Sequence, residues 1–168
     1  MKNFGLILCA ILLGSCQQGK IGYVDTVELM EKSKEKIDIE AKYQVKSTNL
    51  NKKRDSISQS FQLEAQALQA KTASMTQQKA QEEYELLQQR GQFIGQQLQQ
   101  EEQQLQQQGQ SEMDSLVTKV KNEISAYGKE NGFTYILGAG EGGTVLYGKE
   151  NQDLTEVILK IVNDKYQK

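Results

Sequence analysis

The chain has 168 residues, with 20 basic and 22 acidic side chains and a hydrophobic share of 37%. Its net charge of −2 argues against a nucleic-acid-binding protein, because such proteins present a basic face. The sequence contains no histidine, which removes the usual general base and a common zinc ligand. We therefore expect no enzyme activity, no metal site and no cofactor.

The first 15 residues have the pattern of a targeting segment. Lys2 provides a positive start, and residues 4–13 are apolar but too few to cross a bilayer as a helix. Leu13-Gly-Ser-Cys16 then matches the lipobox of bacterial lipoproteins. That resemblance implies a signal peptide at 1–15, lipidation of Cys16 and a short tether at 16–19. The alternative is an ordinary signal peptide with an incidental cysteine.

The residue after Cys16 bears on location. Lipoproteins that stay in the inner membrane carry an aspartate there, whereas this chain has Gln17. We therefore expect a periplasm-facing protein that its lipid anchors to the outer membrane.

Residues 20–25 predict a short strand, since Ile21 and Tyr23 alternate with Val24 and put apolar groups on both faces. Asp25 then suits a helix N-cap, and Glu28 stands three residues later, where a capping box needs it. The chain should change from strand to helix within a few residues.

Residues 26–130 predict helix almost throughout. Apolar residues recur three and four apart, as in a coiled-coil seam, and an extra four-residue step near Gly109 indicates a stutter. In the first half Tyr43, Leu50 and Ile57 continue the seam, but Lys71 and other polar residues interrupt it. Because so thin a seam needs a partner helix, we predict an antiparallel hairpin with its bend near 71–79. An unbroken rod is the alternative.

Residues 131–168 complete a small body. Asn131 and Gly132 predict a helix stop, 133–137 a strand, 138–143 a glycine turn and 144–147 a second strand. Asp153 then suits the cap of a C-terminal helix. Together with 20–25, this β/α body has a thin core, so we expect it to oligomerise.

Two motifs have simple structural explanations. Gly138, Gly140 and Gly143 satisfy the dinucleotide pattern, but that reading requires a helix next, whereas a hairpin loop accounts for the glycines here. The basic run 52–54 could attract an anionic partner or lipid headgroups, or be an exposed helix face.

The whole layout resembles the Skp/OmpH family of periplasmic chaperones. The resemblance rests on Lys20-Ile-Gly-Tyr-Val-Asp25, Asn131-Gly-Phe-Thr-Tyr-Ile-Leu137 and Asp153-Leu-Thr-Glu-Val-Ile158. It implies a homotrimer whose helical hairpins project around a cavity and hold unfolded outer-membrane proteins without ATP. This chain differs from well-known members by being mildly acidic and by its lipobox.

The expected fold class is α+β and mainly α: a long antiparallel helical hairpin inserted into a small sheet, with a C-terminal helix. The expected function is that of a holdase with flexible arms, and the alternative is a structural coiled-coil lipoprotein that acts as a spacer in the cell envelope. Candidate client contacts are Phe61, Leu68, Met75 and Ile94, although each could simply hold the hairpin together.

Overall fold

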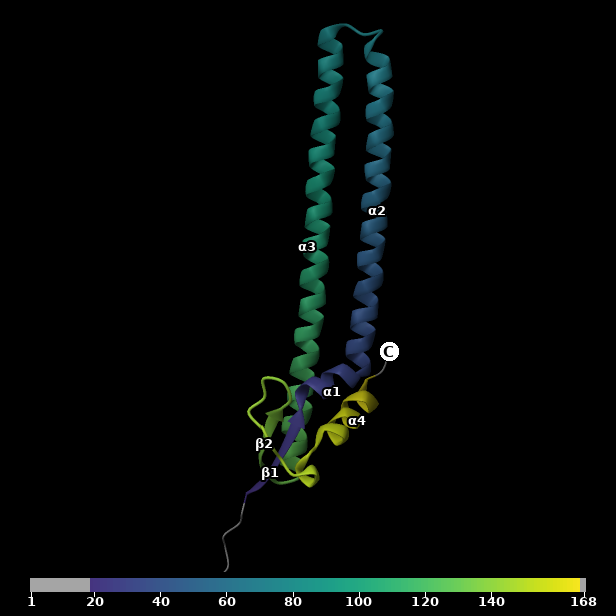
Figure 1. The fold of residues 1–168 in the computed structure, drawn as a ribbon. Helices are drawn as coiled ribbons and strands as arrows, with labels where there is room; N and C mark the ends of the chain where they lie inside the picture. The colour runs from purple at the N-terminus through teal and green to yellow at the C-terminus, as the bar shows by residue number, and fades with distance from the viewer. Residues whose placement is uncertain (1–18, 167–168) are drawn as a thin grey trace, which may run out of the picture. The chain divides into compact units, whose positions relative to one another are not determined.

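The computed structural model describes residues 19–166, and the predicted signal peptide and Cys16 lie outside the described residues. Two compact units make up the chain: one joins the residues up to Lys32 with those from Val120, and the other is Ser33–Lys119. The predicted fold class is confirmed. A helical hairpin separates the two strands of a small sheet, and a short helix ends the chain (Figure 1).

The sheet has two parallel strands, β1 (Lys20–Asp25) and β2 (Phe133–Ala139). Ile21 pairs with Tyr135 and Val24 with Gly138, and the register shifts between Lys20 and Ile21. Parallel strands need a long crossover connection. The chain between β1 and β2 must therefore run out and return, which excludes an unbroken rod.

The prediction of a strand at 144–147 was wrong, because these residues form only an isolated bridge between Val145 and Ala139. The backbone N–H groups of Thr144 and Val145 both donate to the Gly138 carbonyl, at 3.0 and 3.3 Å. These bonds close a tight loop and do not form the paired strands of a β-hairpin. The glycine segment is therefore not the predicted hairpin turn. Leu146, which was to lie in that strand, is 99% exposed.

Helix α1 (Thr26–Lys32) starts at the predicted cap, since Asp25 Oδ1 accepts the N–H groups of Val27 and Glu28, each at 3.0 Å. The reciprocal half of the capping box differs from the prediction. The Asp25 N–H donates to Thr155 Oγ1 at 2.9 Å, and the Glu28 carboxylate pairs with Lys32 instead. A long-range bond thus replaces a local one.

The helix predicted from residue 26 onward breaks at Ser33, and α2 spans Lys34–Thr72. Ser33 adopts an extended backbone with φ −68° and ψ 124°, and its carbonyl accepts the N–H of Ile37. Its side chain is completely buried, and Oγ has no hydrogen-bond partner within the described residues. Serine is disfavoured in the interior of a helix and favours helix ends, which agrees with its place at this break.

Helix α3 spans Gln77–Glu130, so the bend occupies 73–76, inside the stretch 71–79. Hydroxyl groups bind the backbone groups freed there: Thr72 donates to the Gln69 carbonyl, Ser74 to the Lys71 carbonyl, and Thr76 accepts the Lys79 N–H. Within Ser33–Lys119 the two long helices run antiparallel, side by side (Figure 1). We call them the arms.

After α3, Gly132 takes φ 68° and ends the helix as predicted. A 3-10 turn, η1 (Glu150–Gln152), leads to α4 (Thr155–Lys165), whose first N–H group donates to Asp153 Oδ1 at 2.8 Å. α4 packs against α1 and β1. The core of this unit consists of Val24, Leu29, Val120, Ala139, Leu154, Ile158, Leu159 and Val162, each at most 8% exposed.

Candidate functional site

The two arms carry opposite charge. α2 has eight basic and five acidic side chains, a net charge of +3, whereas α3 has five basic and nine acidic side chains, a net charge of −4. Apolar burial between the arms is small, since α2 buries only Ile39 and Leu50. Electrostatic attraction between the arms therefore supplements a thin apolar seam.

Within the described residues, five ion pairs join the arms: Glu35–Lys119, Lys42–Glu112, Lys53–Glu101, Arg54–Glu102 and Glu64–Arg90. All except Arg54–Glu102 share one register, because successive pairs are 7, 11 and 11 residues apart on both arms. These steps are close to two and three turns of a helix with 3.6 residues per turn, so the pairs stay on one side of each arm. We call these four pairs the ladder.

One ladder pair belongs to a larger cluster around Tyr43. Glu112 accepts hydrogen bonds from Lys42 Nζ at 2.6 Å and from the Tyr43 hydroxyl at 2.8 Å. The bond from Lys42 and, to a smaller extent, the bond from Tyr43 hold the pKa of Glu112 below its usual range. Burial and the bond to Glu112 raise the pKa of Tyr43. The ring fits because its partner on α3 is Gly109, where a Cβ would lie 3.3 Å from Cδ1.

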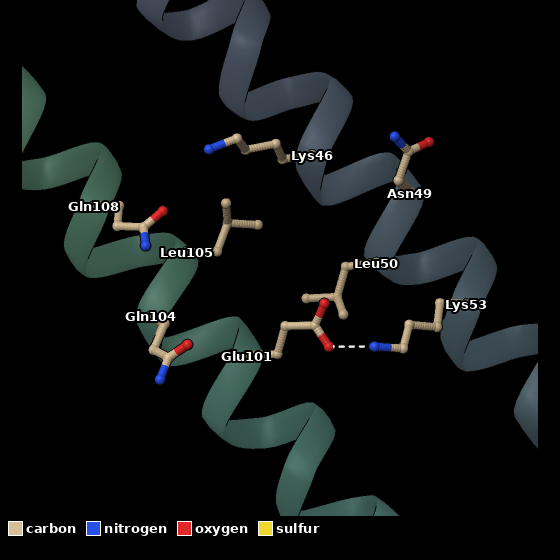
Figure 2. Close-up of a pocket in the computed structure, with 8 residues that line it drawn as sticks. All are labelled: Lys46, Asn49, Leu50, Lys53, Glu101, Gln104, Leu105 and Gln108. Carbon is tan, nitrogen blue, oxygen red and sulfur yellow. Dashed lines mark hydrogen bonds and ion pairs between the residues drawn. The ribbon is translucent and has the colours of Figure 1, made fainter.

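Two hollows open between the arms beside the ladder. The middle hollow, of about 360 Å³, has Leu50, Leu105 and the Lys53–Glu101 pair, 2.5 Å long, in its lining. Figure 2 shows both leucines in the space between the helices, and the Lys53–Glu101 ion pair crosses that space. Its full lining is Lys46, Asn49, Leu50, Lys53, Glu101, Gln104, Leu105 and Gln108.

The second hollow lies nearer the bend and measures about 190 Å³. Apolar and charged side chains line it together, and the Glu64–Arg90 pair, 2.5 Å long, belongs to the lining. The lining comprises Glu64, Ala67, Leu68, Lys71, Met75, Glu83, Leu86, Leu87 and Arg90. The middle hollow and this second, distal hollow are therefore similar: apolar and polar side chains line both, and each lining includes one ladder pair.

Large apolar side chains stand exposed on the arms near the distal hollow. Leu63 is 66%, Phe93 60% and Leu86 53% exposed. Sequence reasoning missed them because they fall outside the seam, where a heptad pattern predicts solvated positions. The signal that could have found them is the presence of large apolar residues outside the seam, since an isolated coiled coil does not need leucine or phenylalanine there.

The four residues predicted as client contacts are all half-buried. Phe61 packs between the arms, with its ring 5.6 Å from the Arg90 guanidinium carbon and in contact range of Gly91. Leu68 and Met75 line the distal hollow, whereas Ile94 lies on α3 and lines neither hollow. The structure thus brings two of the four together at one surface.

The unit that contains the sheet carries a different apolar surface. A hollow of about 440 Å³ is lined by residues of β1, the end of β2 and the loop that follows, including Leu146 and Tyr147. Tyr147 is 86%, Tyr135 62%, Ile21 44% and Leu137 40% exposed. Apolar side chains so exposed around a two-stranded sheet indicate an interaction surface.

The described part of the chain shows no evidence for a dinucleotide site, a metal site or a membrane-spanning helix. The glycine loop at 138–143 leads into irregular backbone, not the helix that a dinucleotide site needs. No group of metal-ligating side chains occurs within residues 19–166. In the same range, no helix is both long and apolar enough to span a membrane.

Comparison with known proteins decides the family. The family described as "Outer membrane protein (OmpH-like)" matches residues 20–162, which is most of the chain. The chain belongs to the OmpH-like family. Among solved structures, the OmpH-like chain is similar to a Caulobacter crescentus protein described as a candidate OmpH-like outer membrane chaperone. The TM-score is 0.78 at 13% identity, with 88% of this chain and 86% of the other covered. No curated protein matches.

Proposed function

We propose that this OmpH-like chain is a holdase chaperone that binds unfolded outer-membrane proteins between its helical arms without ATP. The observation that carries the proposal is the pair of long arms with exposed leucine and phenylalanine beside apolar hollows. Family membership and the description of the Caulobacter crescentus neighbour support a chaperone. A passive chaperone needs only to prefer the unfolded client over its folded form.

The physical basis is many weak contacts on adaptable walls. Each exposed apolar side chain offers a contact that breaks easily, and several contacts along linked arms retain a client through avidity. Glycines at 91, 95 and 109 each lower helix stability by about 1 kcal/mol relative to alanine, which favours bending of α3. In this proposal Leu68 and Met75 contact clients from the lining of the distal hollow, whereas Phe61 and Ile94 do so only where the arms separate.

We further propose that the unit containing the sheet assembles as a homotrimer. A two-stranded sheet is marginal by itself, and this one leaves apolar residues such as Leu146 and Tyr147 exposed. Burying such a surface against other copies would complete the sheet. Light scattering tests this proposal, and a stable monomer at micromolar concentration contradicts it.

The membrane attachment is also a proposal, and its support is the lipobox that ends at Cys16. The expected location is the periplasmic side of the outer membrane. Metabolic labelling with a fatty acid tests it, because Cys16→Ser should abolish the label. The spacer alternative gains no support, since β1 pairs with β2 and the helices between them do not form a straight shaft.

The decisive experiment is an aggregation assay. The full chain carrying Cys16→Ser, purified without nucleotide, should keep a urea-denatured outer-membrane β-barrel protein soluble after dilution. Turbidity reports the outcome. If severalfold excess of the chain leaves aggregation unchanged, the holdase proposal is wrong.

A further inference from the structure

We propose that the ladder side of the arms, and not the opposite side, is the client-binding surface, and that its occupant is an extended apolar polypeptide segment. This inference rests on the proposed function and adds to it a defined surface and a conformation for the bound chain.

The position of the exposed apolar residues on α3 follows from Arg90, a ladder residue. Leu86 lies four residues before Arg90 and Phe93 three residues after it, so all three share one face of the helix. Leu86 also lines the distal hollow. The exposed leucine and phenylalanine therefore flank the ladder.

The same relation holds on α2. Ala67 lines the distal hollow and lies three residues after Glu64, the ladder partner of Arg90. Leu63, 66% exposed, lies four residues before Ala67 and shares its face. Both arms thus contribute apolar groups to one side of the hairpin, near the distal hollow.

The opposite side of α3 has a different chemistry. Between residues 88 and 110, the positions about 160–220° around the helix from Arg90, at roughly 100° per residue, are all glutamine. They are Gln88, Gln92, Gln99, Gln103, Gln106 and Gln110, and all are exposed. Amide side chains offer no apolar contact, so the apolar side chains of a client have little to pack against on this side.

The ladder indicates the conformation of the occupant. Two of its three intervals are 11 residues, so ion pairs cross the space between the arms at intervals of roughly 16 Å. A helical partner, about 10 Å wide, would need an uninterrupted groove. An extended chain can cross each ion pair and place single apolar side chains into the hollows.

The polar lining of the middle hollow suits an extended backbone. Asn49, Gln104 and Gln108 carry amides that both donate and accept hydrogen bonds. An unfolded segment has unpaired N–H and C=O groups that need such partners once water is excluded. Charges nearly cancel: two lysines face one glutamate in the middle hollow, and two cations face two anions in the distal one. A segment without strong charge therefore fits both.

Two double variants of the full Cys16→Ser chain test the proposal. Leu86→Ser with Phe93→Ser removes apolar groups from the ladder side. Ile37→Ser with Tyr84→Ser is the matched control, because Ile37 is 52% and Tyr84 44% exposed. Tyr84 lies six residues before Arg90, which places it roughly 120° away around α3. Circular dichroism establishes that both variants keep their helices.

The readout is the Kd for a urea-denatured outer-membrane β-barrel protein, measured by fluorescence anisotropy after dilution. We expect the ladder-side variant to weaken binding about tenfold and the control less than about twofold, as for truncation of contact residues against non-contact residues. Equal losses, or no loss in either variant, would overturn the proposal while the holdase function stands. Failure of the unsubstituted chain to bind would instead refute the holdase function.

A crosslinking experiment gives an independent decision. A photoreactive amino acid at Leu63 should crosslink to the denatured barrel, and one at Gln99, on the glutamine side, should not. Crosslinks from Leu63 to a second copy of this chain, with none to the client, would identify the ladder side as a contact between copies and contradict the proposal.

Discussion

The backbone N–H of Asp25 donates to the hydroxyl of Thr155 across 130 residues of sequence, at 2.9 Å. The same hydroxyl donates to Asp153 Oδ1 at 2.5 Å, and Thr155 is only 2% exposed. One buried side chain therefore ties the end of β1 to the start of α4. The bond joins these two elements within the sheet unit, next to the start of α1.

Thr155→Val should destabilise the sheet unit, because it leaves the partly buried Asp25 N–H without its acceptor. The expected loss is about 1–3 kcal/mol in the free energy of unfolding, measured with urea. Thr144→Val is the control, since its exposed hydroxyl makes only a 3.4 Å contact to the Gly138 carbonyl. Thr155→Ser should recover most of the loss. Equal stability of the valine and serine variants would rule out this role for the hydroxyl.

Ser33→Ala should stabilise the chain, which is the opposite of the usual effect at a helix N-cap. A capping serine normally contributes about 1 kcal/mol. Ser33 is completely buried and makes no side-chain cap bond, so removing its hydroxyl should raise the free energy of unfolding by about 1 kcal/mol. Urea unfolding measures the change. A loss of stability would mean that the hydroxyl has a partner after all.

Two glycines of α3 should respond differently to alanine. At Gly95 a Cβ meets no atom within 4 Å, so Gly95→Ala should raise stability by about 1 kcal/mol through helix propensity. At Gly109 the Cβ would lie 3.3 Å from Tyr43, whose ring must move, and the gain should vanish or reverse. Thermal unfolding compares the two. Equal gains would show that the Tyr43 ring adapts freely.

Acid should loosen the arms around Glu112. Its pKa is lowered in the folded chain, so its contribution to stability is complete above the unfolded pKa of about 4.3. That contribution is lost as the pH falls through the lower folded value. Spin labels on the two arms should report wider separation in this range. Glu112→Gln should remove the part of the pH dependence that Glu112 causes, and an unchanged profile would contradict the assignment.

Reversing one ladder pair should reveal its coupling. Glu64→Arg puts two cations together and Arg90→Glu puts two anions together, so each should destabilise the hairpin, whereas the double variant restores an opposite pair. For an exposed pair the coupling energy should be about 0.2–1 kcal/mol. A double-mutant cycle from urea unfolding measures it. If the double variant lost as much free energy of unfolding as the two single variants together, the result would contradict a stabilising ion pair at this position.

Local chemistry made much of the fold predictable. Alternation in β1, the Asp25 and Asp153 caps and the Gly132 stop each depend on neighbours within a few residues, and the structure shows each of them. The hairpin followed from a seam too thin for a lone helix. These features are encoded where they occur in the chain, so sequence reasoning could reach them.

The features that were missed depend on distant residues. The strand predicted at 144–147 has suitable side chains, but a strand also needs a partner edge, and the described chain offers it only one bridge. The break at Ser33 has no glycine or proline to announce it. The ladder side can be recognised only when it is known which residues of α2 and α3 face each other. The sequence pattern of one helix does not give that pairing.

The shared spacing of the ladder limits how the arms can change in length during evolution. A residue inserted into one arm alone would rotate every pair between it and the bend by about 100° and separate the charges. Lengthening that preserves the ladder must therefore add matching segments, in whole turns, to both arms at once. Relatives with longer or shorter arms should differ by such paired insertions, mirrored about the bend.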